Sequence, residues 1–177
     1  NHMSDLAKTQ LPVTNSLVLD RQGSVLKVWF NRPEAKNALN AEMTEELVNV
    51  LTLVKDDRSI RTIVLRGKGG FFCAGGDIKG FKSGMQTVDA DEVAKSNRSF
   101  GDVMIMLNEQ PQVVIILVEG AAIGGGLGLA CVADVTLVTA DARFRLSETS
   151  LGIPPAQIAP FVTERVGLTQ ARRLMLT

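Results

Sequence analysis

Histidine and tyrosine are almost missing from this sequence of 177 residues, which contains one His and no Tyr. The one histidine, His2, lies in the tripeptide Asn1-His2-Met3, which resembles the remnant of an expression tag. Without it the chain has no imidazole, which excludes Ser-His-Asp and Cys-His nucleophilic machinery and every His-based metal site. We therefore expect no metal centre, and we expect residues 1–15 to be a flexible N-terminus.

Cysteine is also scarce, and net charge is absent. Cys73 and Cys131 form no CxxC motif and no disulfide framework, so we expect two buried thiols and a cytoplasmic protein. Lys and Arg number 19, and Asp and Glu number 19, which gives a formal net charge of zero. This neutrality, with no stripe of basic and aromatic residues, argues against nucleic acid and against anionic membranes as partners.

Long hydrophobic runs are missing as well. The longest uncharged apolar stretch, residues 120–133, has 14 residues, five of them glycine, whereas a membrane-spanning helix needs about 20. Hydrophobic residues make up 45% of the chain and charged residues 21%, as in ordinary globular proteins. At this length we expect one core domain over residues 16–177.

Short apolar strands alternate with amphipathic helices along the chain. Residues 16–31 alternate in polarity around Arg21-Gln22-Gly23, which predicts a hairpin, and Asn40 is the predicted cap of a helix. This alternation is typical of an α/β fold with a mainly parallel sheet. Further strands are predicted over 62–65, 113–118 and 134–138, and further helices between 88 and 107, over 127–133, and in two short pieces after 154–155.

Two glycine-rich loops, residues 67–76 and 120–128, each follow a predicted buried strand. Glycine permits positive φ and a close approach of the backbone to a ligand. Two such loops facing each other could aim two N–H groups at one oxygen, which is an oxyanion hole. The alternative is tight backbone packing. A dinucleotide fingerprint fails, because the sixth position from Gly124 is Leu129. A Walker A loop fails as well, because Gly69 follows Gly67-Lys68 where Ser or Thr is needed.

Four motifs occur in a fixed order over about residues 15–177. They are NRPEAKNAL at 31–39, FFCAGGDIK at 71–79, GAAIGGGLGLA at 120–130, and FRLSE with LGIP at 144–154. Together they resemble the enoyl-CoA hydratase/isomerase (crotonase) family. The resemblance implies an α/β crotonase-like spiral of ββα units, a homotrimer or hexamer, and a chain from which the usual C-terminal helical part is missing.

The resemblance also implies an acyl-CoA thioester as substrate, with coenzyme A as part of it and no separate cofactor. The thioester carbonyl would be held by the backbone N–H groups of Gly76 and Gly125. Arg32 and Lys36 lie where the family meets the CoA phosphates, although Lys36 could equally be a solvated loop lysine. The adenine pocket maps to the following positions: Ala38, Ala74, Asp77 and Ile78. For Asp77 we favour a helix cap over any catalytic role.

Hydratases of the family typically use two glutamates. The second maps to Glu148, whereas the first falls at Gly128 and is missing. A single acid is the pattern of the Δ3,Δ2-enoyl isomerases of the family, in which one Glu moves a proton between two carbons. We expect an apolar pocket to raise the pKa of Glu148. The alternative is a surface or capping carboxylate.

The segment PPAQIAPFV at 154–162 replaces the glycine-rich run of many members. It resembles the branch of the family that contains isohexenylglutaconyl-CoA hydratase. The favoured reaction is therefore hydration of a branched or glutaconyl-type 2-enoyl-CoA. Double-bond isomerisation is the second hypothesis, and a non-catalytic protein that binds CoA thioesters is the third.

Overall fold

The computed structural model describes residues 9–77, 90–146 and 155–176, with the backbone alone for 90–97. The fold begins with an antiparallel pair, β1 (Leu17–Gln22) and β2 (Val25–Phe30), which confirms the predicted hairpin. Gly23 in the connecting turn has a φ of +61°, a backbone conformation that favours glycine.

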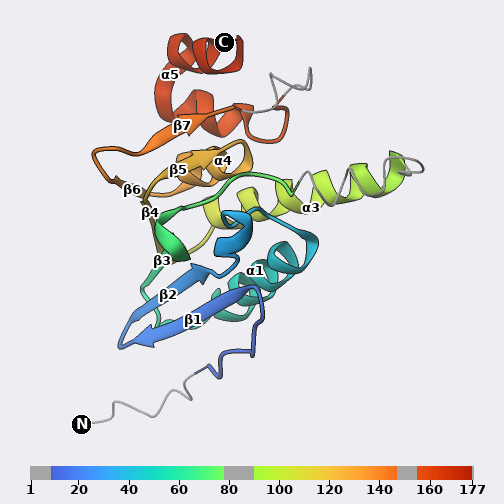
Figure 1. Ribbon diagram of the computed structural model, residues 1–177. Coiled ribbons are helices and arrows are strands. Elements are labelled where there is room, and N and C mark those ends of the chain that lie inside the picture. The colour runs from blue at the N-terminus through green and yellow to red at the C-terminus, as the bar shows by residue number, and fades with distance from the viewer. Residues whose placement is uncertain (1–8, 78–89, 147–154, 177) are drawn as a thin grey trace.

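A five-stranded sheet follows in the order β1-β2-β3-β4-β6 (Figure 1). From β2 onward every neighbouring pair is parallel, so the prediction of a mainly parallel sheet is confirmed. The register places Leu26 beside Ile63 and Ile63 beside Val114, which lines up buried side chains on one face. The three later strands are β3 (Thr62–Gly67), β4 (Val113–Val118) and β6 (Val135–Val138).

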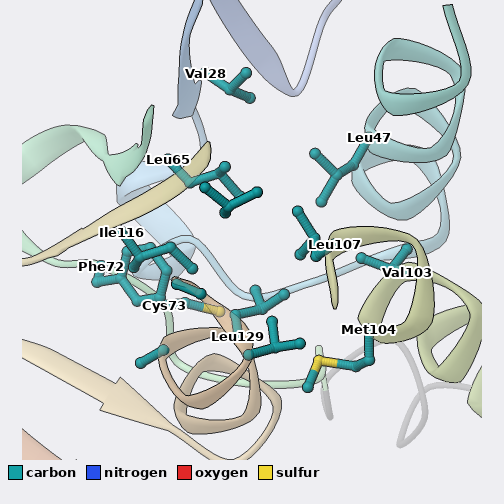
Figure 2. Packing of buried hydrophobic residues seen from close by; sticks show 14 of the residues in the cluster. Val28, Leu47, Leu65, Phe72, Cys73, Val103, Met104, Leu107, Ile116 and Leu129 are labelled. Carbon is teal, nitrogen blue, oxygen red and sulfur yellow. The ribbon is translucent and has the colours of Figure 1, made fainter. Parts of the chain in front are cut away.

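Two helices, α1 (Ala41–Val54) and α3 (Ala90–Asn108), pack against each other beside the sheet. Asn40 caps α1 as predicted, since its side-chain oxygen accepts a hydrogen bond of 2.9 Å from the Met43 N–H. Figure 2 shows Leu47 of α1 and Leu107 of α3 pointing toward the side chains of the central strands. The helices therefore bury one face of the sheet.

The core continues from the sheet into a second layer. Figure 2 shows Phe72 and Cys73, which precede Gly75 and Gly76 in the first glycine-rich loop, beside Leu129. These three side chains are fully buried. The loop is thus anchored in the core just before Gly75 and Gly76.

The second layer contains a short parallel pair, β5 (Ala121–Ile123) and β7 (Arg143–Arg145), and the buried helix α4 (Gly125–Val132). β5 and β7 were not predicted from the sequence, and α4 begins two residues before its predicted start. The two C-terminal helical pieces form α5 (Ala159–Leu176), which is broken at Gly167 with a φ of +75°. Short 3-10 turns occur at η1 (Pro33–Ala35) and η2 (Lys68–Gly70).

No helix within the described ranges is long and apolar enough to cross a membrane. Among the described residues there is also no group of three His, Cys, Asp or Glu side chains that could hold a metal ion. The division into an N-terminal segment of residues 1–15 and a core of residues 16–177 stays a prediction.

Candidate functional site

The two glycine-rich loops lie side by side in the second layer. Cys73 of the first loop forms a parallel bridge with Ala122 of β5. The Cys73 N–H donates to the Ala121 carbonyl at 3.2 Å, and the Ile123 N–H donates to the Cys73 carbonyl at 2.9 Å. The predicted meeting of two separate loops is therefore present, and backbone hydrogen bonds fix their relative position.

Gly75 is the point at which the loops come closest. Its φ is +86°, and a Cβ on it would lie only 2.8 Å from the Ile123 carbonyl oxygen. The same Cβ position lies 3.5 Å from the backbone nitrogen of Gly125. A side chain at position 75 would therefore separate the loops, and glycine brings Gly76 and Gly125 close together.

The N–H groups of Gly76 and Gly125 have no hydrogen-bond partner among the described residues. The Leu39 N–H donates to the Gly75 carbonyl at 2.7 Å, and the Leu39 carbonyl accepts from the Asp77 N–H at 2.9 Å. The N–H of Gly76, which lies between these two bonds, is not used by this pairing. Gly125 is the first residue of α4, where helix geometry provides no partner for the N–H. Two backbone donors are thus available near each other.

Apolar side chains surround Gly125. A Cβ on Gly125 would lie 3.1 Å from the Phe100 ring and 3.3 Å from Cδ1 of Leu39. By contrast, a Cβ on Gly76 would meet no described atom within 4 Å. Within the part of the chain that the structure describes, the Gly76 side is therefore open, while the apolar groups near Gly125 keep the local dielectric low and strengthen any hydrogen bond made there.

The segment 32–39 holds an unusual backbone conformation. Lys36 and Asn37 both have positive φ, at 51° and 53°. The Asn37 side chain is buried; its oxygen accepts from the Arg32 N–H at 2.9 Å, and its nitrogen donates to the Lys68 and Phe71 carbonyls at 2.9 and 2.6 Å. This role of Asn37 was not predicted from the sequence, although asparagine tolerates positive φ better than most residues and that preference was a usable signal.

The structure brings several of the predicted CoA-binding residues together. The Arg32 guanidinium lies 2.9 Å from the Asp77 carboxylate and donates to the Ala38 carbonyl. Ala38 is buried and Ala74 is half-buried. Lys36 is exposed, with its ammonium 5.6 Å from the Phe71 ring centroid. The CoA-binding roles of these residues stay predictions, and two predicted positions, Ile78 and Glu148, lie outside the described residues.

Both cysteines are buried and free, as predicted. Burial raises the pKa of the Cys73 thiol to about 12. Burial also raises the pKa of Cys131 to about 11, and the nearby charge of Arg165 opposes that shift. A thiol of this kind is protonated at neutral pH and is a poor nucleophile, so neither cysteine suits covalent catalysis.

A cavity of about 670 Å³ lies elsewhere, between α4, β6, β7 and α5. Its apolar lining includes Leu127 and Phe144, and three arginines border it. Neither Gly76 nor Gly125 lines this cavity. The paired glycine loops, rather than this cavity, hold the unpartnered backbone donors.

A family model described as Enoyl-CoA hydratase/isomerase matches residues 20–177. Among solved structures, AtuE of Pseudomonas aeruginosa is 52% identical with a TM-score of 0.88, and covers 92% of this chain and 62% of its own. An enoyl-CoA hydratase/isomerase from Marinobacter aquaeolei is 48% identical with a TM-score of 0.85, over 91% of this chain and 62% of its own. This likeness confirms the predicted crotonase-like α/β fold.

A curated relative, the 2,3-dehydroadipyl-CoA hydratase of Escherichia coli, is 34% identical over 92% of this chain and 62% of its own length. The chain spans about half the length of several other curated relatives. The likeness to solved structures and to curated proteins extends over about nine tenths of the chain. Because the family model also matches nearly all of it, the chain belongs to the enoyl-CoA hydratase/isomerase family.

Proposed function

We propose that the chain carries the oxyanion hole of an acyl-CoA enzyme, formed by the N–H groups of Gly76 and Gly125. One observation carries the proposal: the two loops meet at Gly75, where an added Cβ would lie 3.5 Å from the Gly125 nitrogen, and both neighbouring donors have no partner among the described residues. Addition of water to the double bond of a 2-enoyl thioester, or removal of a proton from an isomerising 3-enoyl thioester, moves negative charge onto the carbonyl oxygen. Two fixed N–H groups stabilise that charge, and one such donor is typically worth about 10²–10³ in rate.

Helix α4 adds to this effect. Gly125 is its first residue, so the partial positive charge of the helix N-terminus faces the same oxygen. The chain therefore stabilises an enolate with its own backbone, and His2 is not needed. Coenzyme A is part of the substrate, and no separate cofactor enters this scheme.

Glu148 is our proposed proton-transfer group, on the strength of the resemblance at FRLSE. It would act alone, because Gly128 stands where many hydratases have their other glutamate. General acid–base transfer of this type contributes about 10²–10⁴-fold. Lys36 is the proposed contact for a CoA phosphate, since its ammonium is exposed at the edge of the loop. Ala38, Ala74 and Ile78 are proposed to line the adenine pocket.

We favour hydration of a branched or glutaconyl-type 2-enoyl-CoA. Relatives named as hydratases support hydration as the reaction. The resemblance of the segment at 154–162 to one branch of the family is the reason for proposing a branched or glutaconyl-type acyl group. Isomerisation of an enoyl-CoA is the second candidate, favoured by the single carboxylate. A protein that binds CoA thioesters without turnover is the third candidate, and the missing glutamate at position 128 favours it as well. A homotrimer or hexamer in the cytoplasm also remains part of the proposal.

Mass spectrometry of enoyl-CoA and glutaconyl-CoA thioesters in heavy water distinguishes these candidates. A product heavier by one water would support hydration, and deuterium gained without water would support isomerisation. Bound but unchanged thioester would support the binding protein. Glu148→Gln is the matched variant: loss of product formation with retained CoA binding is expected, and undiminished turnover would contradict its role.

A further inference from the structure

Arg32 is held by two groups of the protein itself. It lies between β2 and η1, and one guanidinium nitrogen is 2.9 Å from Oδ2 of Asp77. The other terminal nitrogen donates to the Ala38 carbonyl. The Arg32 and Asp77 side chains are only 19% and 20% exposed. A guanidinium that donates from both terminal nitrogens in this half-buried setting is a structural brace, and the Asp77 carboxylate already neutralises its charge.

The brace joins two segments that are distant in sequence, 32–39 and 74–77. Asp77, its acidic partner, directly follows Gly76. The ion pair therefore lies at the end of a short parallel ladder, at the residue next to the proposed oxyanion donor Gly76. Three backbone hydrogen bonds form this ladder: Ala74 N–H to Lys36 carbonyl at 3.0 Å, Leu39 N–H to Gly75 carbonyl at 2.7 Å, and Asp77 N–H to Leu39 carbonyl at 2.9 Å.

The 32–39 segment is rigid at its other end as well. The buried Asn37 side chain ties it to the carbonyls of Lys68 and Phe71, just before the first glycine loop turns toward β5. Since Asn37 also accepts from the N–H of Arg32, the arginine backbone is fixed before its side chain reaches Asp77. Through this segment the position of Asp77 is fixed relative to the core.

We propose that Arg32 is a positioning residue for the Gly76 N–H, acting through Asp77, and not a ligand of a CoA phosphate. The inference rests on the proposed oxyanion hole. A donor there must be held to within about 0.5 Å of its productive position. Without the brace the 74–77 loop keeps its backbone ladder but loses the ion pair next to Gly76. CoA would still bind, while stabilisation of the enolate would fall.

The test uses acetoacetyl-CoA, a thioester whose enolate has its own ultraviolet absorption, and free CoA as the second probe. The parent chain should raise the enolate fraction of bound acetoacetyl-CoA. Arg32→Gln and Asp77→Asn should each lower that enolisation constant by about 10-fold to 100-fold. The affinity of Arg32→Gln for free CoA should stay within twofold of the parent. Arg32→Lys keeps the charge near Asp77 and should recover part of the enolate signal.

Arg21→Gln is the matched control, because Arg21 forms a comparable ion pair with Asp57, at 3.4 Å and with side chains 14% and 9% exposed. It lies in β1, away from the glycine loops, and its loss should leave the enolate signal unchanged. A tenfold loss of free-CoA affinity in Arg32→Gln with normal enolisation would overturn the inference. Absence of any enolate signal in the parent would overturn the oxyanion hole itself, and the role of Arg32 with it.

Discussion

Gly128 of α4 and Ile158, just before α5, are in direct contact, and the isoleucine occupies the space of a side chain at position 128. A Cβ on Gly128 would lie 2.4 Å from Cγ2 and 2.9 Å from Cβ of Ile158. Ile158 is 3% exposed and belongs to the core. The position where many hydratases have a glutamate is thus filled from outside by an apolar residue, and a carboxylate has no room there.

This contact predicts that Gly128→Ala destabilises the chain. Alanine normally favours a helix over glycine by about 1 kcal/mol, yet here the methyl group must displace the branched carbon of Ile158. Overpacking of this kind costs about 1–3 kcal/mol. Urea denaturation should show this loss, and Gly128→Ala should cost clearly less in an Ile158→Ala background, since the contact of 2.4 Å with Cγ2 is gone and only the contact of 2.9 Å with Cβ remains.

Gly101→Ala in α3 is the control for helix propensity, because the nearest described atom, Cγ of Gln157, is 4.0 Å from the added Cβ. It should be neutral or slightly stabilising. If Gly128→Ala were equally neutral in the parent background, Ile158 would not be the obstacle that the geometry indicates.

A second prediction concerns Gly75, where the loops meet. Gly75→Ala combines a positive φ with a backbone contact of 2.8 Å to Ile123, so we expect a loss of about 2 kcal/mol or more in stability. The matched control is Gly23→Ala, which has a φ of +61° but no described atom within 4 Å. Thermal denaturation should show a clearly smaller loss for the control. Equal losses would mean that backbone conformation alone, and not the close approach of the loops, requires glycine at 75.

Much of the first layer could be predicted from the sequence, because its elements have local signals. Asn40 marks the start of α1, and the apolar face that begins at Met43 has helical spacing. The short strands β5 and β7 have no such signal: three residues each are too few for a period, and only pairing with each other defines them. The prediction therefore succeeded where periodicity extended over several residues.

The sequence suggested which loops form the candidate site, but it did not suggest the contacts that hold these loops in place. Glycine-rich loops after buried strands indicated exposed N–H groups. The ion pair between Arg32 and Asp77 joins residues 45 positions apart, and neither residue has a local feature that points to the other. The contact between Gly128 and Ile158 is equally non-local. Such contacts depend on how the layers stack, which the order of motifs does not specify.

A third prediction concerns the two thiols. Because burial raises the pKa of Cys73 to about 12 and of Cys131 to about 11, both should resist iodoacetamide in the folded chain at pH 7.4. As urea is added, mass spectrometry should detect labelling of Cys131 before Cys73, since Cys73 is fully buried and Cys131 is 7% exposed. Cys131→Ser identifies the adduct. Rapid labelling of Cys73 without urea would contradict its burial.

The last prediction concerns acid stability and Asp57. Hydrogen bonds from the hydroxyl groups of Ser59 and Thr9, and then the Ser59 N–H and the charge of Arg21, lower the pKa of Asp57 well below its ordinary value of 3.8. A carboxyl with a lowered folded-state pKa stabilises the fold at pH above its unfolded value, and this contribution disappears as pH falls toward the folded value. Asp57→Asn should therefore cost about 1.5–3 kcal/mol near pH 7.

The penalty should shrink steadily as the pH is lowered from about 4 to 2.5, because the wild-type carboxylate loses its advantage over that range. Urea denaturation of both chains at several pH values measures the difference. Asp20→Asn is the control: its carboxylate is 44% exposed and 3.8 Å from the Lys27 ammonium, and such a surface pair contributes less than about 1 kcal/mol. A penalty for Asp57→Asn that stayed constant from pH 7 to pH 2.5 would show that shape, and not charge, is what Asp57 contributes.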